Sequence, residues 1–400
     1  MFAKMLLGLL FGTVIGIITG LIPGLHVNTI CVVALAISDK ILGFFGKIEF
    51  ACFIIAMSIT NSFTNAIPAI FLGAPSGESE SLIILPGHKM LLEGKGNEAL
   101  NLTVLGSILS LLTSVLLTPV LIFLFVFINS VIKKYIGYVI LGFVLFVTLK
   151  GNSKLKNLSF FFLSGILGIF SLGTNNSNTL LPLLSGLFGI SSMVLSLSQN
   201  VSIPKQENVG NMDIKKGMIF KAVIGASLVA SVAAFLPGFG GAQSAILAQT
   251  FLGDMGSEGF LVLTGGINTA NMVISLDTFY SIGKARNGAI VAITSFFESI
   301  TLKQMLIFIF TSLAIGGLSG ALSVFLSKKF SEFITRINYR MILISIIVFL
   351  IGLTFATSGF VGLIILVSSS ALGICASLLT VGKNNLMGCL ILPVLIYFLW

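Results

Sequence analysis

Apolar runs long enough to cross a bilayer follow one another along almost the whole chain. About 17 to 25 apolar residues in a helix span a hydrocarbon layer of about 30 Å. Apolar residues make up 56% of the 400 and charged residues 9%, whereas about a quarter of a soluble domain is usually charged. The sequence therefore predicts an all-α, polytopic membrane protein with about 12 transmembrane helices.

Two of these runs are interrupted by a Pro-Gly pair. Pro23 and Gly24 lie within IPGLHVNTI, and Pro237 and Gly238 lie within LPGFGGAQSAI. Proline lacks the backbone N–H that a helix needs, and glycine disfavours helical backbone, so both runs are expected to be broken helices. Inside a bilayer the freed backbone groups must face protein or a polar cavity. Paired broken helices in two halves of a chain are typical of secondary transporters.

Other landmarks recur in the same order in both halves. Asn61 and Asn65 are matched by Asn268 and Asn271, and GNEA at 96–99 is matched by RNGA at 286–289. Recurrence in order predicts two diverged repeats. The expected units are an N-terminal transmembrane repeat at 1–200, a hydrophilic connector at 201–216 and a C-terminal transmembrane repeat at 217–400. The sequence does not decide whether the repeats are parallel or inverted.

The residues that follow each Pro-Gly break suit a negatively charged ligand. A helix that begins inside the membrane presents unpaired N–H groups and the positive end of its dipole, and glycine lets a ligand approach the backbone closely. Alternatively, Pro and Gly only let the helices bend or pack. The candidate substrate-binding residues at the breaks are Pro23, Gly24, Asn28, Thr29, Pro237, Gly238, Gly240, Gly241, Gln243 and Ser244.

A second group of candidates lies on the asparagine-bearing helices. Asn61 and Asn65 are four residues apart in the run 50–72 and share a helix face, and Asn268 and Asn271 are three apart in the other half. Such amides can line a substrate cavity. They can equally join helices through hydrogen bonds, each worth about 0.6 kcal/mol.

The stretch 73–97 is expected to be a polar segment between spans, and Pro119 is expected to separate two helices. In this stretch Ser76 and Gly77 are further substrate-binding candidates. Glu78 and Glu80, with Asp277 in the second half, are candidates for ion coupling, because carboxylates at or inside a membrane commonly bind cations or protons. An ion pair with Lys284 or Arg286 would instead make Asp277 an ordinary surface group.

Several other classes of protein are disfavoured. The net charge of +9 comes from clusters between spans, which positive-inside retention explains without nucleic acid. The four cysteines have no CxxC spacing, so neither a metal nor a cofactor is expected beyond a coupling Na⁺ or H⁺. GAPSG at 73–77 superficially resembles a serine motif but has no base placed beside it, so no enzyme is expected. A channel is also disfavoured, because it needs a continuous polar lining, whereas the sparse polar residues of this chain gather at the two breaks.

The motifs together resemble the TctA family, the large membrane subunit of tripartite tricarboxylate transporters. The resemblance lies in IPGLHVNT, AIFLGAPSGES, LPGHKMLLEGKGNEAL and LPGFGGAQSA, which are spread over most of the chain. It implies ion-coupled uptake of a small carboxylate, a di- or tricarboxylate, across the cell membrane. It also implies two partners, a small membrane subunit and an extracytoplasmic binding protein.

A second resemblance keeps an alternative open. The duplicated Pro-Gly breaks are similar to those of polyprenyl-phosphate translocases, which recycle lipid carriers. There the bound anion is a phosphate on a long apolar tail, and two helix N-termini suit it equally well.

Overall fold

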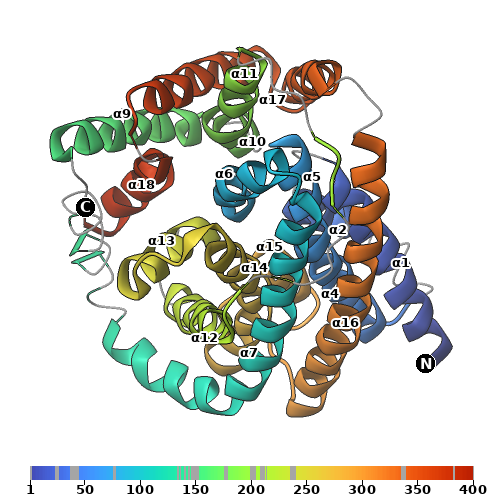
Figure 1. Ribbon diagram of the computed structural model, residues 1–400. Helices are drawn as coiled ribbons and strands as arrows, with labels where there is room; N and C mark the ends of the chain where they lie inside the picture. The colour runs from blue at the N-terminus through green and yellow to red at the C-terminus, as the bar shows by residue number, and fades with distance from the viewer. Residues whose placement is uncertain are drawn as a thin grey trace.

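The computed structural model describes the backbone of most of the chain (Figure 1). The described residues are 2–22, 27–36, 45–74, 78–132, 135, 137–138, 141–142, 145, 153–174, 179–198, 204–207, 212, 214–234, 240–334, 339–381 and 383–399. The helices of the first half are α1 (Phe2–Leu21), α2 (Val27–Ala36), α4 (Lys47–Thr64), α5 (Ala66–Leu72), α6 (Glu78–Leu92), α7 (Gly96–Ile132), α9 (Lys154–Gly173), α10 (Leu180–Leu184), the π-helix η1 (Ser185–Ile190) and α11 (Ser191–Ser198). Those of the second half are α12 (Lys216–Ala233), α13 (Gly241–Leu252), α14 (Gly256–Ile282), α15 (Gly288–Thr294), α16 (Leu302–Ile334), α17 (Tyr339–Leu378), the 3₁₀-helix η2 (Lys383–Met387) and α18 (Gly388–Leu399).

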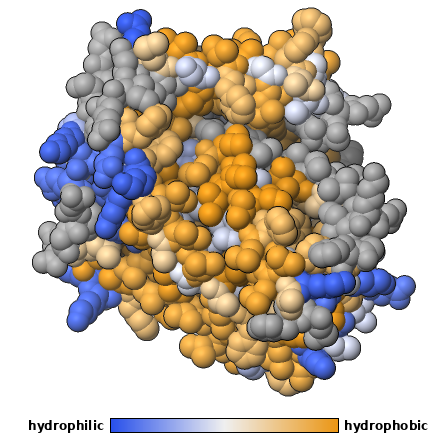
Figure 2. Space-filling view, turned by 90° about the vertical axis from the view of Figure 1, so that its right-hand side faces the viewer, coloured by the Kyte–Doolittle hydropathy of each residue, from blue (hydrophilic) through white to orange (hydrophobic). Residues whose placement is uncertain are grey.

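The helices have the length and surface of membrane spans. Within the described residues, eight helical segments are long and apolar enough to cross a membrane, and three shorter apolar helices accompany them. Figure 2 shows a face covered mainly by apolar side chains, with hydrophilic ones gathered toward its margins. Leu116 and Phe123 on α7, for example, are 79% and 80% exposed. An all-α, multi-pass membrane protein is thus confirmed, and the number twelve stays a prediction.

Helices end and begin on either side of both predicted breaks. α1 ends at Leu21 and α2 begins at Val27, while α12 ends at Ala233 and α13 begins at Gly241. Both breaks therefore separate helices, as expected from proline and glycine. The two Pro-Gly pairs themselves lie outside the described residues.

Two expectations about helices were wrong. The stretch 73–97 contains a helix, α6, on which Leu82, Ile83 and Leu91 are buried. Pro119 does not end a helix, because α7 continues through it to Ile132. Proline is tolerated within membrane helices where neighbouring groups satisfy the backbone that it frees.

Contacts between helices fix their relative directions in the first half. A Cβ added at Gly8 of α1 would meet Glu49 of α4, and one added at Gly20 would meet Thr64. Because both numbers rise together, α1 and α4 run in the same direction. α16 runs with them, since Thr311 contacts Cys52 and Ser319 bonds to Thr60.

In the second half, α12 and α14 form a parallel pair like that of α1 and α4. α12 and α14 run together, because Gly259 lies against Met218 and Gly266 against Ala226. α7 joins this set, since Gly106 lies against Val262 and Thr118 bonds to Asp277.

The two sets of helices run antiparallel to each other. Asn97 at the start of α7 bonds to Ser331 near the end of α16, and farther along α7 Leu111 lies against Gly316. Hence α1, α4 and α16 run one way, and α7, α12 and α14 run the other. Helices that hold matching landmarks in the two halves, α1 with α12 and α4 with α14, are opposed. That the halves are diverged copies stays a prediction.

Glycine allows the closest of these approaches. On α1, Gly8, Gly12, Gly16 and Gly20 recur every four residues along the face that meets α4. On α7, a Cβ at Gly106 would overlap the carbonyl of Val262 on α14. Small residues at such spacing let membrane helices pack backbone to backbone.

We expect Gly106→Ala to lower the stability of the protein. The added methyl would push α7 from α14, and overpacking of this kind typically costs about 1–3 kcal/mol. Gly317→Ala on α16 is the matched control, because a Cβ there meets nothing within 4 Å and alanine favours a helix by up to about 1 kcal/mol. Thermal unfolding in detergent measures both variants. An unchanged melting temperature for the Gly106 variant would contradict this packing.

Candidate functional site

A kink in the first asparagine-bearing helix positions the central polar group. α4 ends at Thr64, Asn65 forms a turn and α5 begins at Ala66. The interruption follows from Pro68, which lacks an N–H for the carbonyl four residues earlier, that of Thr64, and whose ring crowds that carbonyl. The Asn65 side chain is buried at this kink.

The two halves meet at one carboxylate. The Asn65 Nδ2 group donates to Oε1 of Glu80 at 2.6 Å, and the Asn268 Nδ2 group of α14 donates to the same oxygen at 2.9 Å. Glu80 lies in the first turn of α6 and is 4% exposed. Asn268 also approaches the carbonyl of Ser62 at 3.4 Å. The structure therefore brings together three residues that the sequence singled out separately.

This cluster surrounds a buried carboxyl group with amides. The ion pairs found in the described part of the chain, Lys95 with Glu98 and Lys329 with Glu332, do not involve Glu80. Hydrogen bonds to a charged group each contribute about 1.5–3 kcal/mol. The Asn65 Oδ1 atom is buried and has no hydrogen-bond donor among the described residues, and a buried acceptor without a donor costs about 1–3 kcal/mol. A ligand that donates a hydrogen bond would remove that cost.

The other two candidate asparagines differ from this pair. Asn61 donates to Thr19 Oγ1 of α1 at 3.1 Å, so it joins helices and does not reach Glu80. The Asn271 side chain makes no hydrogen bond within the described residues and is half-buried. Asn61 and Asn65 thus have different roles, because Asn61 joins α4 to α1 and Asn65 binds the Glu80 carboxyl group.

The start of α13 lies one helix away from this cluster. α13 packs against α6 and α14, the helices that carry Glu80 and Asn268. The Gly240 N–H donates to Gln243 Oε1 at 2.9 Å, and the Ser244 hydroxyl donates to the Gly240 carbonyl at 2.8 Å. The Gly240 N–H, which we expected to be open to an anion, therefore donates to the amide oxygen of Gln243.

Asp277 lies apart from these groups. It is nine residues beyond Asn268 on α14, so it faces the opposite side of the helix and is displaced by about 13.5 Å along the axis. Thr118 of α7 donates to its carboxyl group at 3.0 Å. Two surface partners were expected, and neither Lys284 nor Arg286 forms an ion pair with Asp277 within the described residues. The Lys284 ammonium donates to Asn129 Oδ1 at 2.7 Å.

The remaining candidates lie wholly or partly outside the described residues. Wholly outside are Pro23, Gly24, Ser76, Gly77, Pro237 and Gly238. The backbones of Asn28, Thr29 and Glu78 belong to α2 and α6, but their side chains are not described. Within the described part, His, Cys, Asp and Glu do not form a group of three or more that could hold a metal ion.

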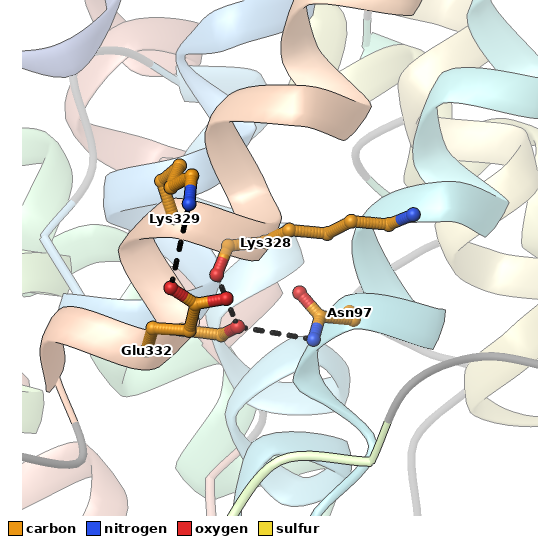
Figure 3. Close-up of polar contacts among 5 residues, drawn as sticks. Asn97, Lys328, Lys329 and Glu332 are labelled. Atoms are coloured by element: carbon orange, nitrogen blue, oxygen red, sulfur yellow. Dashed lines mark hydrogen bonds and ion pairs between the residues drawn. The ribbon is translucent and has the colours of Figure 1, made fainter.

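A polar tie between the halves was missed from sequence. Asn97, noted only as part of a repeated motif, donates to Ser331 Oγ of α16 at 3.1 Å and accepts from Ser327 at 2.9 Å. Figure 3 shows Asn97 beside this turn of α16, where Lys329 pairs with Glu332. The sequence holds one signal for this contact. Asn97 follows Lys95 and Gly96 at the expected start of a helix, where a polar side chain can bind a neighbouring helix.

The hydrophilic connector adds to this tie. The Gly96 N–H donates to Gln206 Oε1 at 2.8 Å, and the Gln206 Nε2 group donates to the Leu91 carbonyl at 3.0 Å. The Glu207 N–H donates to the Gly94 carbonyl at 2.8 Å. The connector therefore binds the loop between α6 and α7.

Comparisons with known proteins identify the family of the chain. A sequence model described as Tripartite tricarboxylate transporter TctA family matches residues 6–388. The protein named Uncharacterized protein MJ1079, from Methanocaldococcus jannaschii, is 31% identical over 392 residues, which cover 94% of each chain. No solved structure matches the chain. The chain belongs to the tripartite tricarboxylate transporter TctA family and is a component of a membrane transporter.

Proposed function

We propose that the protein is a secondary transporter that carries a small organic anion, a di- or tricarboxylate, across the cell membrane. The anion binds between the two halves, near the broken helices, and its movement is coupled to Na⁺ or H⁺. The family match supports transport, and the residues described below support an anion with carboxylate groups.

One observation carries the choice of a carboxylate. Amides from both halves, Asn65 and Asn268, donate to the same buried oxygen of Glu80. These donors bind a carboxyl group of the protein itself, and the carboxylate of a substrate has the same acceptor chemistry. In the proposal the substrate takes over the two amides when Glu80 is protonated or turns away. In this proposal Glu80 competes with the substrate for the two amides, and its protonation contributes to coupling.

The broken helices complete the proposed site. The N-termini of α2 and α13 direct their N–H groups and dipoles toward the substrate. On α13, Gln243 must release the Gly240 N–H before that group can bind an anion. The residues proposed to contact substrate are Pro23, Gly24, Asn28, Thr29, Asn61, Asn65, Ser76, Gly77, Pro237, Gly238, Gly240, Gly241, Gln243, Ser244, Asn268 and Asn271.

Coupling is proposed to use the carboxylates Glu78, Glu80 and Asp277. Helices that carry matching landmarks run in opposite directions in the two halves. Opposed repeats around a central site support alternating access by movement of one unit against the other. The name of the family supports a tripartite assembly, in which a small membrane subunit and an extracytoplasmic binding protein act with this chain.

We expect citrate, tartrate or succinate to raise the melting temperature of the purified protein. A ligand that binds only the folded state stabilises it by about 2.7 kcal/mol at a concentration 100 times its Kd. The comparison ligand is undecaprenyl phosphate, which presents an anion on an apolar tail. Stabilisation by the lipid phosphate alone would refute the carboxylate proposal in favour of a lipid-carrier translocase.

We expect Asn268→Ala to weaken citrate uptake into proteoliposomes about tenfold or more in apparent affinity. A hydrogen bond to a charged group contributes about 1.5–3 kcal/mol, and about 1.4 kcal/mol corresponds to a factor of ten. Asn65→Ala should act in the same direction. Asn101→Ala is the control, because Asn101 of α7 makes no hydrogen bond within the described residues. Equal effects of all three variants would contradict the assignment.

A further inference from the structure

Asp277 is enclosed between α7 and α14. Its exposed fraction is 0%. The Thr118 hydroxyl lies 3.0 Å from Oδ1 and 3.2 Å from Oδ2, and it also lies 3.2 Å from the carbonyl of Ser114. These contacts determine which protonation state the pocket can accommodate.

A count of hydrogens favours the neutral acid. The Thr118 hydroxyl has one hydrogen and three acceptors within reach. If Asp277 is ionised, that hydrogen serves only one of them well, and a buried carboxylate is left with a single donor. If Asp277 is protonated, its O–H donates to Thr118 Oγ1, and Thr118 donates to the Ser114 carbonyl. Both hydrogens are then used, and no charge is buried.

No cation balances an ionised Asp277 among the described residues. The ion pairs of this part of the chain lie elsewhere. The charged residue of α14 nearest to it in sequence is Glu258, and beyond the end of the helix come Lys284, whose ammonium is bonded to Asn129, and Arg286. The charged residue of α7 is Glu98, in its first turn, while α13 and α15 have none.

The other helices packed on α14 also carry titratable groups, and the contacts printed for Asp277 include none of them. α12 carries Lys216 and Lys221 near its start, at the level of Gly259. Glu80 of α6 is bonded to Asn268, on the opposite side of α14. The remaining ones on those helices are Lys47, Glu49 and Cys52 of α4, Glu78, His88 and Lys89 of α6, and Lys303, Lys328, Lys329 and Glu332 of α16. On α14 itself Tyr280 follows Asp277 by three residues, and Arg286 lies beyond the end of the helix.

Buried hydroxyls lie on α7 beside Asp277 and on the neighbouring α12. Ser114 and Ser110 lie one and two turns before Thr118 on the same face of α7, and Ser227 lies on the neighbouring α12. All three are fully buried, and their hydroxyl oxygens have no hydrogen-bond partner in the part of the chain that the structure describes. Ser110 lies against Gly266 of α14, two residues before Asn268. These groups can hydrogen-bond water that enters between the helices.

We propose that Asp277 is the proton-binding carboxyl of the transport cycle, held as the neutral acid against Thr118. This rests on the proposed function, since it names the coupling ion. When α7 and α14 separate at this level and water enters, the O–H bond of Asp277 breaks, the proton passes to water and a carboxylate remains. Uptake of a proton from water on the other side restores the acid. Because α14 carries Asn268 on its opposite face, one helix joins the proton site to the carboxylate cluster.

Infrared spectroscopy of the purified protein tests the protonation state without any substrate. At pH 7 the wild type should show the carbonyl stretching band of a protonated carboxylic acid that Asp277→Asn lacks. Asp277→Glu should retain a band, and Thr118→Val should shift it. The control Asp254→Asn removes an exposed aspartate that accepts from the Gly256 N–H, and it should leave the band unchanged. A carboxylate band in its place at pH 7 would overturn the proposal.

Citrate uptake into proteoliposomes tests the coupling. An inward proton gradient should stimulate the wild type and the Asp254 variant, and the stimulation should fall to onefold in Asp277→Asn. Stimulation that persists in that variant, or a wild type that responds to a sodium gradient and not to pH, would overturn the assignment. If the wild type transports no carboxylate, the proposed function fails, while the infrared result still decides whether Asp277 holds a proton.

Discussion

A carboxyl group enclosed by apolar helices needs hydrogen-bond partners on the protein itself, whether it is ionised or neutral. Glu80 finds them in two amides that come from different halves of the chain, Asn65 and Asn268. The kink at Pro68, the position of α6 and the direction of α14 all place donors around this one oxygen. The polar centre of the molecule is therefore also the contact between its halves.

Close packing makes this arrangement possible. Glycine lets α1 approach α4, and Gly106 lets α7 approach α14, so that long apolar helices touch through their backbones. In lipid the hydrophobic effect does not press helices together, and dispersion contacts of this kind have to do so. Side chains such as Thr118 and Asp277 can then meet across the interface at hydrogen-bond distance.

Much of this could be predicted from the sequence, and the remainder depends on tertiary contacts. The first apolar run predicts where α1 begins and ends, and the second Pro-Gly pair predicts that a helix ends before it and another begins after it, as α12 and α13 do. α6 was missed because glycine, serine and charged residues in 73–97 are typical of a loop, whereas its burial comes from helices distant in sequence. Asn61 and Asn65 share one predicted face, yet one bonds to Thr19 and the other to Glu80. Helical periodicity identifies both as candidates, but only the neighbouring helices separate their roles.

The tie around Asn97 has a mechanical consequence. It fastens the first turn of α7 to the last turns of α16, while the connector holds the adjoining loop. When one of two helices tilts about a contact at its end, its residues move farther the more distant they are from that contact. Thr118 stands 21 residues from that contact, or about 30 Å along α7. A tilt of α7 by a few degrees about this contact therefore moves Thr118 much farther than it moves Asn97.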